Sequence, residues 1–197
     1  MSLAIFLMPT GDFRDELVRW KERIKHEISG QPYTSHPPHM TILNMEVENE
    51  KDGVAIVSAF ADFNDSIQIL INRKDVFWND TSTGGHTLFF GIEKNDALFS
   101  LQKLLAKALQ KVKKDAQPPD YLLGNKQLLE SFNKFGFPFV GNHWIPHFTI
   151  SSVKAEKKHP IIVDFLSTTK KYHFIVNQIS VWRVDEDEHT LLEEVNF

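Results

Sequence analysis

A five-residue motif containing one histidine and one threonine occurs twice in this chain of 197 residues. The first copy, Pro38 to Ile42, reads Pro-His-Met-Thr-Ile, and the second, Pro146 to Ile150, reads Pro-His-Phe-Thr-Ile about 108 positions later. Side chains alternate between the two faces of a strand, so each copy would turn one imidazole and one hydroxyl to the same surface. A structural duplication, with these polar groups satisfied inside a core, is the alternative interpretation.

Two imidazoles that face each other across a groove are suited to general acid–base catalysis at a phosphorus centre. Because histidine titrates near pH 6.5, one of His39 and His147 can accept a proton while the other donates one. The hydroxyls of Thr41 and Thr149 can donate hydrogen bonds to phosphate oxygens and stabilise the charge of the transition state. This scheme requires no metal and no cofactor, and it leaves open which ring is the acid.

A transition-metal site is a competing interpretation, because imidazole binds zinc, copper and nickel. The histidines concerned form two pairs, His36 with His39 and His143 with His147. Prolines at positions 37, 38 and 146 exclude the helical spacing that would make such pairs persuasive. We therefore expect no metal and interpret His36 and His143 as flanking polar residues or as groups at the rim of the groove.

The hydrophobic pattern predicts the elements that position the two motifs. A strand, a helix, a motif strand, a short helix and paired strands follow one another twice along the chain. The first series comprises a strand at 3–7, a helix ending at 29–30, the motif strand, a short helix around 54–61 and a strand at 66–71 continuing to 78. The second comprises a strand at 87–92, a helix at 98–112, the motif strand, a short helix at 161–166, a long strand at 172–184, a turn at 185–188 and a strand at 190–195.

This duplication predicts an α+β fold with pseudo-two-fold symmetry, in which antiparallel sheets and flanking helices surround a central groove. We expect a single bilobal domain over residues 1–197, with intertwined lobes and approximate repeat units at 1–82 and 83–197. The segment at about 114–142 has no counterpart before the first motif, and it is rich in proline, glycine and aromatic residues. We interpret it as an insertion that can act as a lid.

Composition limits the class of partner. Net charge is −4 and the basic residues are scattered, which disfavours binding to an extended nucleic-acid duplex but permits a nucleotide or an RNA terminus. The absence of cysteine excludes disulfides and thiolate chemistry and is typical of a cytoplasmic protein. The apolar run at 3–8 is too short for a signal peptide or a membrane span. We therefore expect a soluble cytoplasmic protein without a membrane partner, and the sequence is silent on its oligomeric state.

Several further side chains are candidates for contact with substrate. The candidate substrate-binding residues are Tyr33, Trp78, His143 and Trp144, which lie near turns or motifs, although packing in the core is the default for each aromatic one. Candidate phosphate contacts, for which a solvated charge is the default, are Arg73, Lys74, Lys134, Lys154 and Arg183. The histidines expected to be ordinary surface or strand residues are His86, His159, His173 and His189.

At the two motifs the chain resembles the two-histidine (2H) phosphoesterase superfamily, which includes 2′-5′ RNA ligase-like proteins and cyclic nucleotide phosphodiesterases. The resemblance covers nearly the whole chain and implies a bilobal fold whose two motifs line a central groove. It also implies that His39 and His147 are catalytic and that Thr41 and Thr149 bind phosphate. The segment at 114–142 departs from the family pattern and bears on substrate size and access.

The resemblance implies phosphodiester chemistry without selecting one reaction. Hydrolysis and transesterification share the same acid–base pair, with water or a ribose hydroxyl as nucleophile. We expect a metal-independent phosphodiesterase that hydrolyses a ribose 2′,3′-cyclic phosphate or a short RNA phosphodiester. The alternatives are a 2′-5′ RNA ligase or an RNA end-trimming enzyme, and a non-catalytic nucleotide-binding module.

Overall fold

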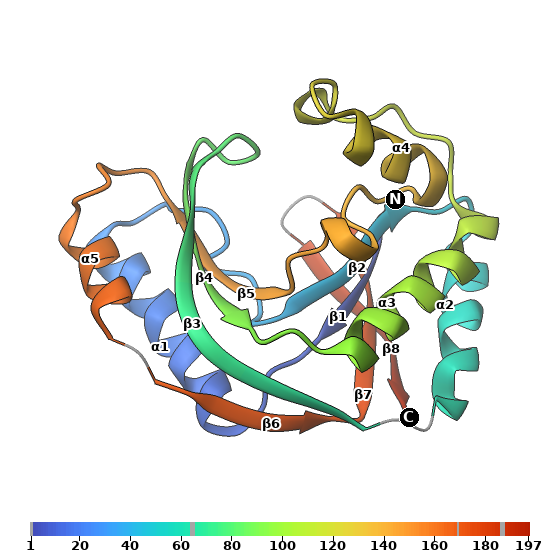
Figure 1. Ribbon diagram of the computed structural model, residues 1–197, viewed down its shortest axis with the longest axis horizontal. Helices are drawn as coiled ribbons and strands as arrows, with labels where there is room; N and C mark the ends of the chain where they lie inside the picture. Colours follow the sequence, from blue (N-terminus) through green and yellow to red (C-terminus); the bar gives the residue numbers. More distant parts are fainter. Residues whose placement is uncertain (1, 64–65, 169, 186–187) are drawn as a thin grey trace.

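The fold is built on two four-stranded antiparallel sheets, as the computed structural model shows (Figure 1). The structure describes residues 2–63, 66–168, 170–185 and 188–197. The first sheet has the order β2-β1-β7-β8, with β1 at Ser2–Leu7, β2 at Met40–Glu46, β7 at Gln178–Asp185 and β8 at Glu188–Asn196. The second has the order β5-β4-β3-β6, with β3 at Ile67–Asp80, β4 at Gly85–Ile92, β5 at His147–Val153 and β6 at Tyr172–Val176.

The two motif strands occupy equivalent places in these sheets. β2 and β5 are each an outer strand, and each pairs with the strand that precedes it in its own unit, β1 or β4. The two outer strands also lie next to each other where the sheets meet. This arrangement matches the predicted α+β fold with pseudo-two-fold symmetry around a central groove.

Helices cover the outer faces of the sheets. The α-helices are α1 at Gly11–Glu27, α2 at Glu50–Ser58, α3 at Asp96–Leu109, α4 at Lys126–Phe135 and α5 at Pro160–Ser167. Short 3-10 helices are η1 at Ala59–Asp62, η2 at Gln110–Val112, η3 at Asp120–Leu122 and η4 at Gly141–His143. Asn49, Asn95 and Asn125 cap α2, α3 and α4, each accepting a hydrogen bond from a backbone N–H of the first turn.

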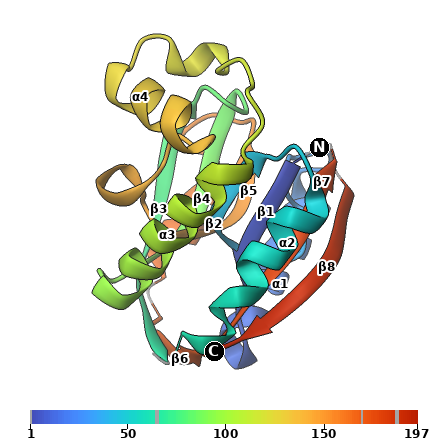
Figure 2. The ribbon, with the colours of Figure 1, turned by 90° about the vertical axis from the view of Figure 1, so that its right-hand side faces the viewer.

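The two long helices pack on sheets other than those of their flanking strands. α1 follows β1, but its Phe13 packs against Phe90 of β4 and Phe148 of β5, with ring centroids 5.3 and 5.0 Å away. α3 follows β4 but lies beside β2 and α2 (Figure 2). The two sheets share one cluster of buried apolar side chains. Each half of the molecule therefore depends on a helix from the other.

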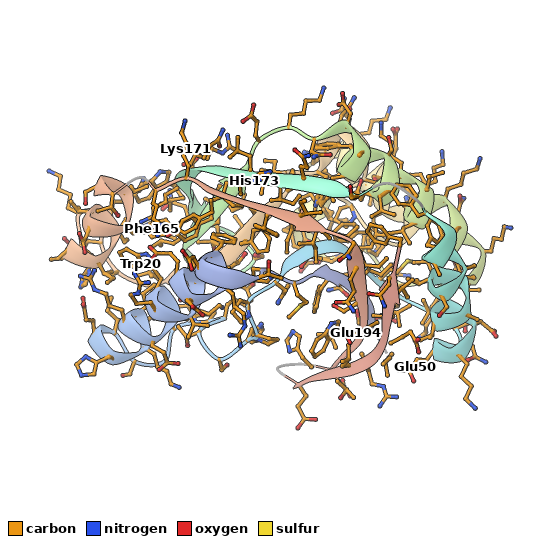
Figure 3. The ribbon with its side chains drawn as sticks, turned by 90° about the horizontal axis from the view of Figure 1, so that it is seen from below. Trp20, Glu50, Phe165, Lys171, His173 and Glu194 are labelled. Carbon is orange, nitrogen blue, oxygen red and sulfur yellow. The ribbon has the colours of Figure 1, made fainter. Side chains whose placement is uncertain are left out.

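Aromatic packing fixes α1 and α5 together. Trp20 and Phe165 lie next to each other, with ring centroids 5.1 Å apart in an edge-to-face arrangement (Figure 3). The Lys74 ammonium from β3 lies 4.7 Å from the Trp20 ring centroid and 5.0 Å from that of Phe165. A desolvated lysine over aromatic rings is stabilised by cation–π attraction, so Lys74 belongs to this packed layer.

The prediction of one long strand over 172–184 is wrong. β6 ends at Val176 in the second sheet, and β7 begins at Gln178 in the first, so the chain changes sheets at Asn177. Apolar residues alternate with the same period on both sides of this crossing, and periodicity therefore could not reveal it. The predicted turn at 185–188 includes residues 186 and 187, which lie outside the described residues.

The segment predicted as an insertion contains η3, α4 and the first two residues of η4, and its α4 lies next to α3 at the upper right of Figure 1. The proposed boundary between repeat units, at residues 82 and 83, falls in the turn between β3 and β4 and remains a prediction. Within the described ranges, none of the helices has the length and apolarity needed to cross a membrane.

Candidate functional site

A groove of about 690 Å³ lies where the two motif strands approach each other. Seven of the predicted site residues line it: His39, Thr41, His147, Thr149, Tyr33, His143 and Trp144. The apolar residues of the motifs, including Met40 and Phe148, are fully buried on the opposite side of their strands. The alternation of side chains thus places both imidazoles and both hydroxyls in one cavity.

The same β-bulge interrupts both motif strands. In the first sheet Ile5 pairs with Leu43 and Phe6 pairs with Thr41, so the register skips Ile42. In the second sheet Leu88 pairs with Ser151 and Phe89 with Thr149, so the register skips Ile150. A bulge bends its strand and redirects neighbouring side chains. Each bulge directly follows the motif threonine and therefore sets the direction of the histidine and the threonine together.

The two histidines make equivalent hydrogen bonds. The Nδ1 atom of His39 lies 2.7 Å from the carbonyl oxygen of Pro37, and that of His147 lies 2.6 Å from the carbonyl oxygen of Ile145. A carbonyl only accepts, so each Nδ1 must carry the hydrogen. The Nε2 atom of each ring is left to accept or donate a proton.

His39 lies among aromatic and basic side chains. The Phe6 ring stacks on it, with centroids 3.8 Å apart and planes inclined by 19°. His189 of β8 lies 5.9 Å from His39 and 4.5 Å from His36, measured between ring centroids. Burial lowers the pKa of His39 to about 3; the hydrogen bond to the carbonyl of Pro37 opposes this shift, and electrostatic effects of Lys21, His189 and His36 add to it. This ring is held neutral in the free protein.

His147 has a different electrostatic environment. Its ring meets those of Phe89 and Phe77 nearly edge-on, at centroid distances of 5.0 and 5.1 Å. Burial also lowers the pKa of His147, whereas the carbonyl of Ile145 and the negative charge of Asp80 raise it and Arg73 lowers it. The carboxylate therefore favours the protonated form of His147, and among the described residues no carboxylate acts on the pKa of His39 in this way.

Asp80, at the end of β3, is held ionised by its hydrogen bonds. Its carboxylate accepts from the backbone N–H of Ser82 at 3.0 Å and from the hydroxyls of Ser82 and Thr87, both at 2.6 Å. Burial alone would raise the pKa of Asp80, but these bonds outweigh it and the pKa is lowered. The groove thus has a fixed negative charge on the His147 side.

The candidate substrate-binding residues lie in different environments. Tyr33 lines the groove with a left-handed backbone (φ 70°), and burial raises the pKa of its phenol. The indole N–H of the buried Trp144 donates to the carbonyl of Thr41 at 3.2 Å, so this side chain also positions the first motif strand. His143 lines the groove, as expected for a rim residue.

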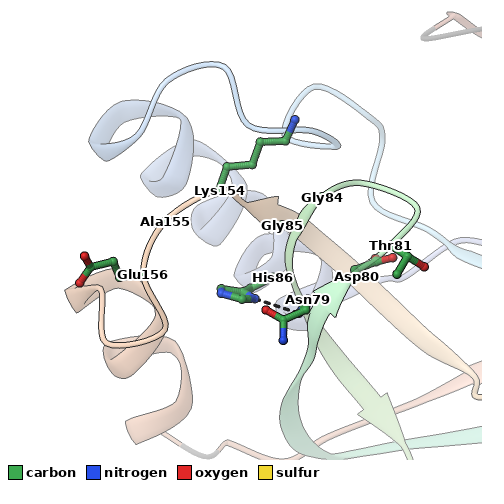
Figure 4. A pocket seen from close by; sticks show the side chains of 9 residues that line it. All are labelled: Asn79, Asp80, Thr81, Gly84, Gly85, His86, Lys154, Ala155 and Glu156. Carbon is green, nitrogen blue, oxygen red and sulfur yellow. Dashed lines mark hydrogen bonds between the residues drawn. The ribbon is translucent and has the colours of Figure 1, made fainter.

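Trp78 lies outside this groove. Its ring is 41% exposed and packs edge-on against His86, at a centroid distance of 5.1 Å. His86 lines a separate open cavity behind the β3–β4 hairpin, and its Nδ1 accepts from the backbone N–H of Asn79 (Figure 4). Neighbouring residues of a strand face opposite sides, so Phe77 enters the groove and Trp78 does not.

Sequence reasoning did not place three ionisable residues of the groove there: Lys21, Asp80 and His189. His189 was expected to be an ordinary surface or strand residue; it does lie on a strand, but it faces the groove. None of the five cations predicted as phosphate contacts lines the groove. Arg183, for example, pairs with Glu50 through two contacts of 2.6 Å. Across the described ranges, no cluster of three or more histidine and acidic side chains is arranged to hold a metal ion.

Solved structures share this fold over nearly their whole length. TT0787 of Thermus thermophilus matches with a TM-score of 0.66 and 18% identity, covering 100% of this chain and 97% of that one. Apo LigT of E. coli matches with a TM-score of 0.59 and 12% identity, covering 98% and 95%. Usb1 of Kluyveromyces marxianus matches with a TM-score of 0.51 and 8% identity, covering 100% and 98%. LigT is also known in complexes with 3′-AMP and with NADP+.

Sequence comparison gives the family. None of the curated proteins compared with the chain matches it. The model of the 2′-5′ RNA ligase superfamily, in contrast, matches residues 13–188. This match supports a phosphodiesterase-type role and agrees with the resemblance of the two motifs to two-histidine phosphoesterases. The chain therefore belongs to the 2′-5′ RNA ligase superfamily.

Proposed function

We propose that this protein hydrolyses a ribose 2′,3′-cyclic phosphate or a short RNA phosphodiester, with His39 and His147 as the acid–base pair. The observation that carries the proposal is the pair of Nδ1–carbonyl hydrogen bonds, to Pro37 and Ile145. Because both rings border one groove with Nδ1 occupied, the proton-transferring atom of each is Nε2. Thr41 and Thr149 supply hydroxyl donors for the phosphate oxygens.

The electrostatic difference between the two rings supports an assignment of roles. Burial, together with the charge of Lys21, keeps His39 neutral, so it is the base, and Asp80 favours protonated His147, so it is the acid. His39 Nε2 removes a proton from water as the water oxygen bonds to phosphorus. The bond from phosphorus to one ribose oxygen breaks, and His147 Nε2 gives that oxygen its proton. Exchange of protons with solvent then restores both rings.

The dimensions of the groove and the solved structures that share its fold favour a nucleotide or an RNA terminus. A volume of about 690 Å³ is in the range of a nucleotide-sized ligand site. Aromatic side chains, among them Phe137 and Phe139 of the 114–142 segment, line it and provide surfaces for a base. LigT, which shares the fold, binds 3′-AMP. We extend this class of ligand to the present groove.

A panel of nucleoside 2′,3′-cyclic phosphates tests the proposal. Phosphorus NMR would follow the loss of the cyclic phosphate and identify which ribose oxygen retains the phosphate. We expect turnover that persists in the presence of a chelator. Binding of these nucleotides without turnover at any pH between 5 and 9 would reject catalysis and favour a nucleotide-binding module.

RNA ligation is the second candidate, because the matching family is described by that reaction. The same acid–base pair would activate a ribose hydroxyl in place of water. Supplying two RNA halves, one ending in a 2′,3′-cyclic phosphate, together with a cyclic mononucleotide separates the alternatives. A joined product would favour ligation, and consumption of the mononucleotide alone would favour hydrolysis.

A further inference from the structure

The carbonyl groups of the two bulged residues, Ile42 and Ile150, accept hydrogen bonds from different kinds of side chain, one neutral and one an amine. A bulged residue leaves the strand ladder, so its buried carbonyl requires another partner. The carbonyl of Ile42 accepts from the side-chain amide of Gln102 on α3 at 3.4 Å. The carbonyl of Ile150 accepts from the ammonium of Lys21 on α1 at 3.1 Å. Each donor comes from the long helix that precedes the other motif.

Lys21 and Gln102 are therefore counterparts in the two halves, and both are buried, at 4% and 0% exposure. Gln102 also donates to the carbonyl of Phe139 at 2.7 Å and accepts from the N–H of Gly141 at 2.9 Å. Lys21 makes its second bond to the carbonyl of Tyr33 at 2.5 Å. The neutral amide of Gln102 thus satisfies the bulge carbonyl of Ile42. Satisfying a bulge carbonyl therefore does not require the positive charge that Lys21 carries at Ile150.

Among the described residues, no carboxylate pairs with the charge of Lys21. Its two partners are neutral carbonyls, and it takes part in none of the ion pairs among described residues. Burial lowers the pKa of Lys21 to about 8, and the titratable side chain found to respond to its charge is His39. A buried ammonium without a carboxylate is unfavourable unless an anion joins it.

Lys21 also borders the groove, whereas Gln102 does not. Of the described residues that line the groove, Lys21 is the one lysine or arginine. An ammonium has three N–H donors, and two are accounted for by Tyr33 and Ile150. The third has no partner among the described residues, and Lys21 lines the same groove as Thr149, the residue before Ile150.

We propose that the Lys21 ammonium is the phosphate-binding cation of this groove, donating to a non-bridging phosphate oxygen of the substrate. The inference deepens the proposed function and rests on it for the identity of the anion. A charged donor binds phosphate more strongly than a neutral one, and it stabilises the additional negative charge that develops at phosphorus. Lys21 thus has a structural bond that Gln102 shares and a ligand contact that Gln102 lacks.

The test is to give Lys21 the side chain of its counterpart. Lys21→Gln retains a donor for the bulge carbonyl but removes the charge, and Lys21→Arg retains a charge. Lys25→Gln, on the exposed side of the same helix, is the matched control. We expect Lys21→Gln to bind 3′-AMP at least about tenfold more weakly at pH 7 by calorimetry, while Lys25→Gln binds it as the wild type does.

The pH dependence of 3′-AMP affinity separates the effect of the Lys21 charge from that of its hydrogen bonds. Between pH 7 and 9.5 wild-type Lys21 loses its proton, because its pKa is lowered to about 8. The ratio of wild-type to Lys21→Gln affinity for 3′-AMP should therefore fall towards one across this range. A folded Lys21→Gln protein with unchanged affinity and an unchanged ratio would overturn the inference. If the Lys21→Gln variant does not fold, NMR titration of the Lys21 Nζ in the wild type can be used in its place. The pKa of Lys21 should then rise when 3′-AMP binds, and an unchanged pKa would overturn the inference.

Binding and turnover are measured separately, so the two proposals can fail independently. Lys21-dependent binding of 3′-AMP without hydrolysis of any cyclic phosphate would reject the proposed catalysis and support the phosphate contact. Hydrolysis that Lys21→Gln leaves within twofold of the wild-type kcat/KM would support catalysis and reject the contact.

Discussion

The two halves of the groove share their geometry and differ in their charge. Both motif histidines bond through Nδ1 to the carbonyl two residues earlier, and both motif strands have a bulge directly after the threonine. The His39 side adds Lys21, His36 and His189, whereas the His147 side adds Asp80. Duplication therefore accounts for where the rings lie, and later divergence of their neighbours accounts for the different roles that we propose for them.

Removing either imidazole should have the largest effect. His39→Ala and His147→Ala should each reduce kcat/KM by about 10²-fold or more, because each removes one proton-transfer partner. Steady-state rates on a cyclic nucleotide would measure this. His173→Ala, at an exposed position of β6 (Figure 3), is the control and should leave the rate unchanged. A loss of kcat/KM in only one of the two histidine variants would contradict the proposal that the histidines act as an acid–base pair.

The threonine hydroxyls should have the next largest effect. Thr41→Val and Thr149→Val preserve shape but remove a donor to the charged phosphate, which should cost about 1–3 kcal/mol of transition-state stabilisation. This corresponds to a loss of roughly 5- to 150-fold in kcat/KM. Similar losses for the two variants would indicate that the phosphate lies midway between the motifs. Losses below about twofold in both would remove the threonines from the mechanism.

The pH profile compares the charges of the two halves directly. Activity requires neutral His39 and protonated His147, and the pKa values of both are lowered, that of His39 to about 3. The bell-shaped profile of kcat/KM should therefore reach its maximum below pH 6.5, fall on the acidic side as His39 gains a proton, and fall on the alkaline side as His147 loses one. A maximum above pH 7 would contradict the assignment.

Asp80→Asn should shift one limb of that profile. Asp80 raises the pKa of His147, so its removal should move the alkaline limb to lower pH and leave the acidic limb in place. An attraction of about 1 kcal/mol corresponds to roughly a fivefold loss of kcat/KM on the alkaline limb. Asp75→Asn, at an exposed position of the same strand, serves as control. Movement of the acidic limb instead would exchange the proposed roles of the two histidines.

The smallest effect concerns the support of the first motif strand. Trp144→Phe removes the indole N–H that donates to the Thr41 carbonyl, and it should lower the free energy of unfolding by about 1 kcal/mol. Trp78→Phe, behind the groove, should leave it nearly unchanged. Urea denaturation measures both. Equal stability of the two variants would mean that the Trp144 hydrogen bond contributes nothing to the position of β2.

The duplicated motif made the centre of the groove predictable. Alternation along a strand places His39 with Thr41 and His147 with Thr149, and the structure brings both pairs to one cavity. Asp80 was not predictable in this way, because its position relative to His147 depends on the long-range pairing of β3, β4 and β5 in the second sheet. His189 was missed because strand periodicity does not reveal which strand will be its neighbour.

Lys21 illustrates the same limit for helices. The sequence places it in an amphipathic helix, where a lysine is expected at the solvated face. Its burial follows from α1 packing on the sheet of the other half, a long-range arrangement that local patterns do not encode. The single strand predicted over 172–184 was wrong for a related reason, since continuous alternation hides a change of sheet at Asn177.

The exchange of α1 and α3 between the sheets also determines how the groove can admit a ligand. A hinge that separated β2 from β5 would have to pull Phe13 away from Phe90 and Phe148 and expose a shared core to water. This packing therefore opposes any separation of the two strands at the base of the groove. The remaining walls of the groove come from the 114–142 segment, through Phe137 and Phe139, and from the β3–β4 hairpin, through Asp80 and Ser82, so a change in the width of the groove would have to come from these two segments.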